Sequence, residues 1–449
     1  MNFLVQADWV LPVTRPPIVD GALLIANGRI VAVGLAKDLL SSHSGSVPQI
    51  HFPRSVVTPG LVNPHTHLDN SLLPYRLKGY RGFEEWITLM ADAVRRQTDQ
   101  ERAQAVLKGI QSLLKAGVTC VGDISRDGTS FDILTRYRFK GVVFRELICL
   151  TKEQMTNRLK DLEHWCQGQR TLVRGLAPHS PYTVIPEALR QASLLSRSRR
   201  LPLSFHLAES PMERRFLKGS SQGLTGLQTL LKSLPSPTSP VDYADRFGLL
   251  TPQTLLIHCV QLTESDIRLL AQRRSWVVHC PRSNQNLQVG MMPLSHFRTA
   301  GGRFCLATDG LASVPSLDPK DEVAFAVALS RNRPSQYPAL APHQWLSLIT
   351  LKAAQALGWG NRVGSLEPGK DADLAVFTSS VAIADPYELL FSSCPATAVF
   401  VDGQPIYLSE DGQERVKSSL NHLFSPHRRP TEQIFGNERE EIFLSPTTG

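Results

Sequence analysis

The feature that most constrains the fold is a repeated alternation of short apolar segments with amphipathic segments through the middle of the chain. The first strand candidate carries His65, and seven more follow: Val118–Asp123, Gly141–Leu147, Leu172–Ala177, Leu203–Leu207, Leu255–Cys259, Trp276–Cys280 and Phe304–Thr308. Stretches with helical periodicity lie between most of them, for example Pro186–Ser196, Glu264–Arg273 and Pro319–Leu329. Eight such units predict an α/β fold of the (β/α)8, or TIM barrel, type.

A doubly wound open sheet is the competing arrangement for the same alternation. It would not normally carry so many polar residues at its strand ends.

The two ends of one helix can be predicted from the sequence. Thr98 and Glu101 have the spacing of a capping box, and the apolar pattern that follows them stops at Gly117.

Both ends of the chain predict short strands. Asn27-Gly28 and Asp402-Gly403 each separate two apolar runs, which is a strong signal for a two-residue hairpin. We therefore expect a small composite β-sandwich domain in residues 1–57 and 364–410, with the barrel in residues 58–363. Residues 219–245 are rich in Gly, Ser and Pro and predict an excursion, and residues 411–449 predict a partly irregular tail.

Composition limits the classes of partner. The net charge is 48 − 40 = +8, but the basic residues are dispersed in small clusters, so we expect no nucleic-acid partner. Seven cysteines lie far apart with no C-x-x-C pair, which predicts reduced thiols and a cytoplasmic protein. We expect no membrane partner, since no apolar run reaches spanning length, and no signal peptide.

The chemistry is predicted at the carboxyl ends of the strands. His65 and His67 project from one face of a strand end, which makes half of a metal site. Other strand candidates end in His206 and Glu209, His258, His279 and Asp309. Any one histidine has a structural alternative as a hydrogen-bonded core residue or part of a turn. The repetition in register favours an active site, because a barrel builds its catalytic face from these ends.

Several longer motifs resemble a known family. TPGLVNPHTHLD, GLAPHSPYTV, FHLAES, IHC, VVHCPRSN and ATDG are similar to signatures of the amidohydrolase superfamily, in its cytosine-deaminase-like and chlorohydrolase-like branch. VGSLEPGKDADLAVF resembles the return of that family into its β domain. Within the branch, GLAPHSPYT and FEEWI look most like nucleoside-type deaminases, including aminodeoxyfutalosine deaminases.

The resemblance implies a metal-dependent hydrolase. His65, His67, His206 and Asp309 would bind one divalent ion, with Zn²⁺ favoured and Fe²⁺ as the alternative. That ion would lower the pKa of a water molecule, and Glu209 would carry protons to a ring nitrogen and to the departing amine.

The resemblance also assigns further roles. His258 would steady the attacking oxygen, and Asp309 would accept a hydrogen bond or proton from the water. Substrate contacts are expected from His179, His279, Ser283, Asn284 and Trp86. Trp86 has an alternative home on an apolar helix face. Asp123, Arg145 and Glu146 also follow strand candidates, and we expect them to form structural ion pairs, with pocket contacts as the alternative.

A missing lysine and the presence of Glu209 indicate the number of metal ions and the type of reaction that the resemblance implies. Two-metal relatives place a lysine at the end of the fourth strand, whereas this strand ends at Pro178-His179, so the site should hold one ion. Glu209 favours deamination, because expulsion of an amine needs a proton shuttle. The predicted substrate is an amino-substituted N-heterocycle such as a purine nucleoside derivative.

Two alternatives remain. The same fold could act on another leaving group, as a chlorohydrolase or cyclic amidase, or it could be a non-catalytic binding barrel. Gly219–Gly223 matches the nucleophile-elbow pattern of a serine hydrolase, but it follows a charged helical stretch instead of a strand. The family resemblance further implies a homo-oligomer.

Overall fold

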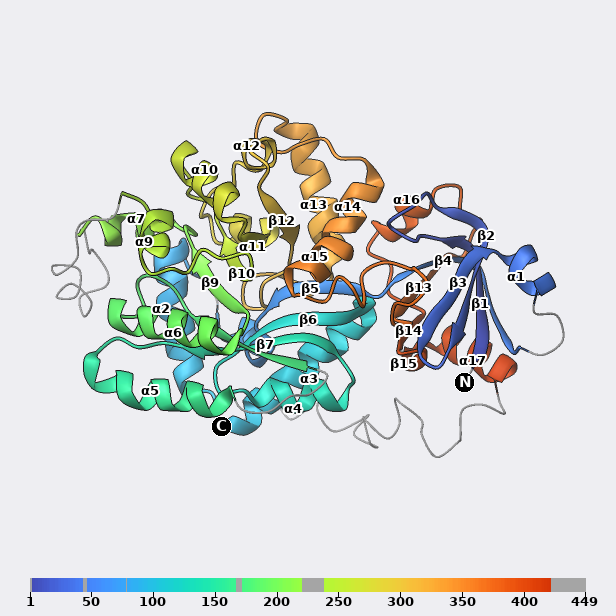
Figure 1. The fold of residues 1–449 in the computed structure, drawn as a ribbon, viewed down its shortest axis with the longest axis horizontal. Helices are drawn as coiled ribbons and strands as arrows, with labels where there is room; N and C mark the ends of the chain where they lie inside the picture. The colour runs from blue at the N-terminus through green and yellow to red at the C-terminus, as the bar shows by residue number, and fades with distance from the viewer. Residues whose placement is uncertain (1, 43–46, 78, 167–171, 220–237, 421–449) are drawn as a thin grey trace.

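The computed structural model describes residues 2–42, 47–77, 79–166, 172–219 and 238–420, which form a parallel barrel beside a smaller sheet (Figure 1). The barrel strands are β5 (Leu61–Thr66), β6 (Val118–Ser125), β7 (Lys140–Leu147), β8 (Leu172–Pro178), β9 (Leu203–Leu207), β10 (Thr254–His258), β11 (Trp276–His279) and β12 (Arg303–Leu306). They are hydrogen-bonded in sequence order from β5 to β12, and every pair is parallel. At the seam, the Asp309 amide donates to the carbonyl of His65 at 3.2 Å. The predicted (β/α)8 fold is confirmed.

Helices cover the outside of the barrel. The longer ones are α2 (Phe83–Arg96), α3 (Asp99–Ala116), α5 (Lys152–Trp165), α6 (Pro186–Arg199), α10 (Glu264–Arg273) and α13 (Pro319–Asn332). The shorter ones are η1 (Leu68–Asn70), η2 (Leu73–Arg76), α4 (Thr129–Arg136), α7 (Pro211–Leu217), α9 (Pro240–Arg246), α11 (Pro281–Asn286), α12 (Leu294–Thr299), α14 (Pro342–Leu348) and α15 (Leu351–Ala356). The predicted capping box is present at the start of α3, and Gly117 ends that helix with φ of 87°.

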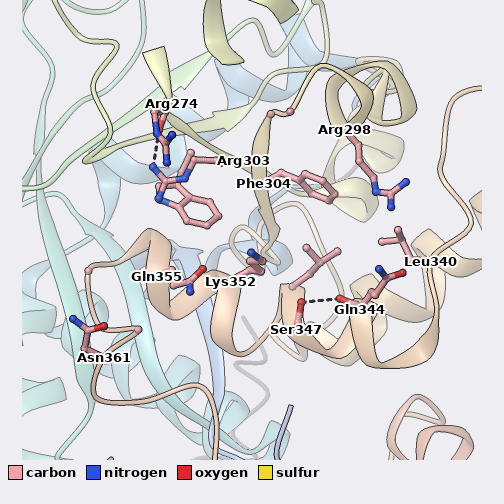
Figure 2. Close-up of a pocket in the computed structure, with 16 residues that line it drawn as sticks. Arg274, Arg298, Arg303, Phe304, Leu340, Gln344, Ser347, Lys352, Gln355 and Asn361 are labelled. Carbon is pink, nitrogen blue, oxygen red and sulfur yellow. Dashed lines mark hydrogen bonds between the residues drawn. The ribbon is translucent and has the colours of Figure 1, made fainter. Parts of the chain in front are cut away.

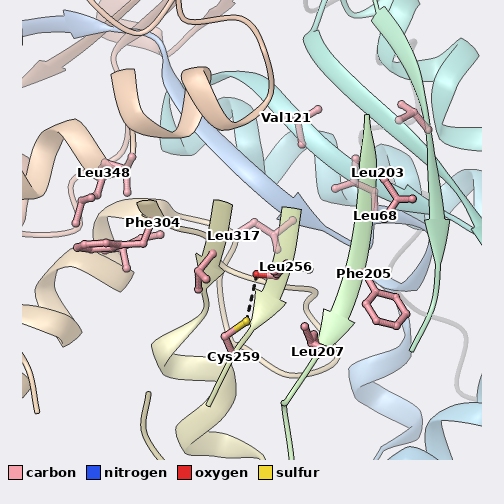
Figure 3. Close-up of a cluster of buried hydrophobic side chains, with 14 of the residues drawn as sticks. Leu68, Val121, Leu203, Phe205, Leu207, Leu256, Cys259, Phe304, Leu317 and Leu348 are labelled. Atoms are coloured by element: carbon pink, nitrogen blue, oxygen red, sulfur yellow. Dashed lines mark hydrogen bonds between the residues drawn. The ribbon is translucent and has the colours of Figure 1, made fainter. Parts of the chain in front are cut away.

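Strand alternation separates two buried layers. In β9, Phe205 and Leu207 lie in the outer hydrophobic cluster with Leu256 of β10 (Figure 3). The neighbours of Leu256 in β10, Leu255 and Ile257, belong to a second cluster that fills the barrel interior. Because side chains alternate along a strand, His206 points inward between Phe205 and Leu207.

The second sheet is built from both ends of the chain, as predicted. Its seven strands run in the order β15-β14-β13-β4-β1-β2-β3 and share one hydrogen-bonded sheet. Their bounds are β1 (Asn2–Val10), β2 (Ile18–Ala26), β3 (Arg29–Leu35), β4 (Gln49–Pro59), β13 (Leu374–Thr378), β14 (Ala398–Val401) and β15 (Gln404–Leu408). Helices α1 (Ala36–Ser42), α16 (Pro386–Leu390) and α17 (Glu410–Leu420) accompany it.

Both predicted hairpins are confirmed. Asn27 and Gly28 have φ of 52° and 78° between β2 and β3, and Asp402 and Gly403 have φ of 49° and 67° between β14 and β15. Positive φ at both central positions is the geometry that matches the twist of a hairpin. The exact domain limits, 57/58 and 363/364, stay predictions.

A buried ion cluster joins the barrel to the small sheet. Lys140, at the start of β7, contacts Asp371, Asp373 and Asp402 through its Nζ at 2.8, 2.7 and 2.7 Å. Its side chain is only 3% exposed. One cation on the barrel thus contacts three carboxylates of the returning chain.

Two predicted irregular segments lie largely outside the described residues. The described end of the 219–245 excursion contains α9, and residues 220–237 are not described. The described start of the predicted tail belongs to α17, and residues 421–449 are not described. Among described residues, no helix has the length and apolar character needed to cross a bilayer.

Candidate active site

The candidate site lies where β5, β9, β10 and β12 end. His65 lies in β5 and His67 directly after it, while His206 lies in β9. Asp309 follows β12, and its carboxylate Oδ1 lies 3.3 Å from His65 Nε2 and 3.6 Å from His67 Nε2. The Nε2 atoms of His67 and His206 are 3.4 Å apart. The four side chains predicted to bind a metal therefore converge on one point.

These separations fit a common ion. Donor atoms about 2.0–2.2 Å from a tetrahedrally coordinated ion lie about 3.3–3.6 Å from one another. The ligand atoms of His65, His67 and His206 all lie within 4.8 Å of one another. His65 Nε2 is buried and makes no hydrogen bond, although Asp309 lies nearby. Because buried polar atoms normally have a hydrogen-bond partner, this free nitrogen fits the role of a metal ligand.

The histidines have the protonation state that a metal requires. Burial, reinforced by neighbouring imidazoles, lowers the pKa of His67 to about 3 and that of His206 well below its usual value. Neutral rings offer a free lone pair. His206 Nδ1 lies 3.0 Å from the carbonyl of His179 and donates to it, which leaves Nε2 free to face the site.

Asp309 is held in place by two hydroxyl groups. Ser283 Oγ and Ser313 Oγ donate to its Oδ2 at 2.8 and 2.7 Å. Burial opposes ionisation of Asp309, but His65 and His67 hold its pKa well below the ordinary range. Its Oδ1 is therefore left, ionised, to face the histidines.

A second acid lies beside this cluster. Glu209 Oε1 is 3.3 Å from His258 Nε2, and both side chains are buried. Burial, with the Asp309 and Glu213 carboxylates, raises the pKa of Glu209 well above its usual value. Burial also lowers the pKa of His258 to about 4. A protonated carboxyl next to a neutral imidazole forms a proton donor and acceptor in direct contact.

The backbone at the strand ends is strained. Ala208, His258, Cys259 and Asp309 have φ of 52°, 70°, 49° and 66°, a region that non-glycine residues rarely adopt. Such strain clusters at functional sites. Here it turns the chain so that residues at the strand ends face the site.

Several supporting residues give little signal in the sequence. Glu213 accepts hydrogen bonds from the amides of Ala208 and Glu209 at 2.8 and 3.0 Å, and so fixes the turn that carries Glu209. The Ser210-x-x-Glu213 spacing was an available capping-box signal. No comparable signal marked Tyr337, because its partner His279 is distant in the sequence, and Ser313, four residues after Asp309, was not singled out by any motif.

Three predicted substrate contacts have partners within the site. Asn284 Oδ1 accepts from His258 Nδ1 at 2.8 Å. His279 Nε2 lies 2.7 Å from the Tyr337 hydroxyl. Together with the Ser283–Asp309 contact, these bonds give Ser283, Asn284 and His279 a positioning role, and their contact with a substrate stays a prediction.

The other two predicted substrate contacts, His179 and Trp86, lie in different layers of the barrel. His179 follows β8, and its ring centroid is 4.9 Å from that of His206, which places it beside the candidate metal ligands. Trp86 of α2 is buried in the outer core, packs on Phe83 and donates to the Ala312 carbonyl at 3.3 Å. The expected ion pairing of Asp123 is replaced by hydrogen bonds from Thr66 and the Leu68 amide, both at 2.9 Å.

Arg145 and Glu146, at the end of β7, were expected to form ion pairs as well. Arg145 donates through Nη1 to the backbone carbonyl of Arg126. Burial raises the pKa of Glu146 to about 7, although Arg126 and Arg145 oppose the shift.

Comparison with known proteins gives one consistent result. The model of the amidohydrolase family matches residues 56–406. A 5-methylthioadenosine/S-adenosylhomocysteine deaminase of Saccharophagus degradans is 30% identical over 431 residues, covering 90% of this chain and 91% of the relative. An aminodeoxyfutalosine deaminase of Deinococcus radiodurans is 30% identical over 339 residues, covering 72% and 78%. The structure of a Xanthomonas campestris adenosine deaminase with bound zinc has a TM-score of 0.78 at 25% identity, covering 93% and 97%.

Proposed function

The chain belongs to the amidohydrolase family, and from that premise we propose that it is a metal-dependent aminohydrolase releasing ammonia from a purine nucleoside derivative. One observation carries the proposal: Glu209, in contact with His258, lies beside the convergent cluster of three histidines and Asp309. Hydrolysis at a metal site needs the cluster, and loss of an amine needs the acid.

His65, His67, His206 and Asp309 would hold one divalent ion. Three imidazole nitrogens and one carboxylate oxygen at tetrahedral spacing favour Zn²⁺, with Fe²⁺ as the alternative. An ion bound there would lower the pKa of a water molecule towards neutrality and so supply hydroxide.

The protein's own groups would manage the protons. Glu209 would donate its proton to the ring nitrogen next to the amine-bearing carbon. His258 Nε2, which lies 3.3 Å from Glu209, would take the first proton of the attacking water, donate a hydrogen bond to the attacking oxygen, and return that proton through Glu209 to the departing amine. Glu209 would regain its own proton from the second water hydrogen as the carbonyl forms. Asp309, ionised and held by two serines, would orient the water.

The substrate class follows from the named relatives. Methylthioadenosine, adenosylhomocysteine and adenosine all carry an amino group on a purine ring, and the names of the relatives specify deamination of such nucleosides. His179 would contact this ring from beside His206. Stacking by Trp86 would require the indole to leave its buried position.

A substrate panel tests the function. Metal-loaded protein is assayed for ammonia release from methylthioadenosine, adenosylhomocysteine, adenosine, aminodeoxyfutalosine and guanine, and for chloride release from a chlorotriazine. We expect ammonia from at least one of the 6-aminopurine nucleosides and no chloride. Chloride release without ammonia would support the chlorohydrolase alternative, and metal-bound protein inert to all of them would support a binding barrel.

Two further properties belong to this proposal. All seven cysteines are free thiols, five of them buried, which supports a cytoplasmic location. A homo-oligomer stays a prediction, and light scattering after gel filtration measures it.

A further inference from the structure

A second cavity opens at the amino-terminal end of the barrel, opposite the candidate active site. It has a volume of about 730 Å³ and lies between the starts of β11 and β12 and the helices α14 and α15 (Figure 2). Trp276 and Arg303 are the first residues of those two strands, whereas His279 and Asp309 lie at or beyond their far ends. The cavity shares no lining residue with the metal cluster.

Cations dominate the polar lining. Arg274, Arg298, Arg303 and Lys352 line the cavity, and the lining contains no aspartate or glutamate. Within the described part of the chain, none of these four forms an ion pair with a carboxylate, and Arg303 donates to the carbonyl of Arg274 at 2.9 Å. Figure 2 shows Lys352 between Arg303 on one side and Arg298 on the other.

The cations repel one another. Partial burial and, next, the charge of Arg274 lower the pKa of Arg303. Uncompensated like charges around a cavity cost free energy that a bound anion recovers. The exposed side chains of Arg274, Arg298 and Lys352 leave that charge accessible from solvent.

The remaining lining suits an organic anion. Phe304, Leu340 and Leu348 contribute apolar surface, and Gln344 supplies an amide donor and acceptor. The guanidinium carbon of Arg303 lies 4.1 Å from the ring centroid of Trp276. This contact fixes the plane of the Arg303 guanidinium group. The volume falls in the range of small-molecule sites.

We propose that this cavity, formed by Arg274, Arg298, Arg303 and Lys352 around Phe304, Leu340 and Leu348, binds a small organic phosphate. Arginine forks match the oxygens of a phosphate group with two parallel hydrogen bonds, and lysine adds a point charge. The apolar side chains would contact the organic part of the ligand. This site is independent of the proposed deamination.

Calorimetry on the full-length, metal-loaded protein tests the proposal with 1-naphthyl phosphate as the probe, because it combines one phosphate with an apolar body and is no purine. Inorganic phosphate and 1-naphthol are the two partial probes. We expect saturable binding with a Kd below about 1 mM, and binding of each partial probe at least about tenfold weaker.

Matched variants locate the site. Arg274→Gln with Lys352→Gln should weaken naphthyl phosphate at least about tenfold, whereas Arg331→Gln, an exposed arginine of α13 outside the cavity, should leave the Kd unchanged. Equal melting temperatures and equal deaminase activity show that the double variant is folded. Absence of saturable binding, an unchanged Kd in the double variant, or displacement of the probe by a nucleoside substrate would overturn the proposal.

Discussion

Glu209 Oε1 lies 3.3 Å from His258 Nε2, across the ends of the neighbouring strands β9 and β10. Parallel pairing sets this distance, because Ile257 is in register with His206 and the strained turns after both strands direct the next polar side chains to the same side. The pair stands next to the histidine cluster, so a proton can pass between the two residues at the place where water and substrate would meet.

Replacing Glu209 with glutamine tests the proton shuttle. The amide keeps the shape of the side chain but cannot transfer a proton, so we expect turnover to fall by about 10²–10⁴-fold with metal content unchanged. Glu264→Gln, at a side chain that is 89% exposed on α10, is the control. Ammonia release at the wild-type rate would remove Glu209 from the mechanism.

Replacing Asn284 with alanine tests the orientation of His258. The 2.8 Å bond to Asn284 Oδ1 places the proton of His258 on Nδ1 and directs Nε2 at Glu209. Loss of such a supporting contact should lower kcat by about 10–100-fold while the metal stays bound. Gln285→Ala, on the exposed side of the same helix, should have no effect. An unchanged kcat would mean that His258 needs no such partner.

Removing both serine hydroxyls from Asp309 tests metal affinity. Ser283→Ala with Ser313→Ala leaves Oδ2 without its two donors, and we expect affinity for the ion to fall by about 10–100-fold. Competition with a chelator of known affinity measures the loss. Ser265→Ala, at an exposed position, serves as the reference, and equal affinities would show that Asp309 does not depend on these donors.

The Lys140 cluster predicts a pH-dependent loss of stability. Lys140→Met leaves Asp373 buried without its cation, whereas Asp371 keeps Arg362 at 2.7 Å, and the loss should cost about 3–5 kcal/mol at pH 8. Burial already raises the pKa of Asp373 to about 6 despite the lysine, and removal of the lysine raises it further. The folded variant then binds protons more tightly than the unfolded chain does, so its stability falls as the pH rises from the ordinary aspartate pKa of 3.8 through the raised pKa of Asp373. The difference from the wild type opens above about pH 6, where the wild-type Asp373 is already ionised.

Denaturant unfolding at pH 5 and pH 8 measures this effect. The difference between the variant and the wild type should be larger at pH 8. Lys152→Met, whose side chain is 72% exposed, should change neither value. Equal losses at both pH values would show that the orphaned Asp373 carboxylate does not take up a proton.

The fold was predictable because its signals are local. The Asn27-Gly28 and Asp402-Gly403 turns, the Thr98 capping box and the apolar strands each depend on a few adjacent residues, and all are present in the structure. The convergence of His65, His67, His206 and Asp309 was predictable for a related reason. Each lies near or just beyond the end of a strand, and a barrel gathers strand ends on one face. Their role as metal ligands stays a prediction.

Some supporting contacts were not predictable, because they join residues that are distant in the sequence. Ser283 of α11 donates to Asp309, 26 residues further along the chain, and no local pattern pairs the two. Tyr337 gave no signal of its own, yet its hydroxyl bonds to His279. The cationic cavity was also invisible, since Arg274, Arg298, Arg303 and Lys352 meet only after the strands and helices pack.

Metal titration of the stripped protein tests whether a single bound ion supports the release of ammonia. Protein freed of metal by a chelator is reloaded with known equivalents of Zn²⁺ or, without oxygen, Fe²⁺, and ammonia release from a 6-aminopurine nucleoside is measured at each step. The account predicts no activity in the stripped protein, a linear rise to one equivalent per chain and then a plateau, with no rise in a His206→Ala variant. Full activity in the stripped protein, or a rise that continues to two equivalents, would contradict it.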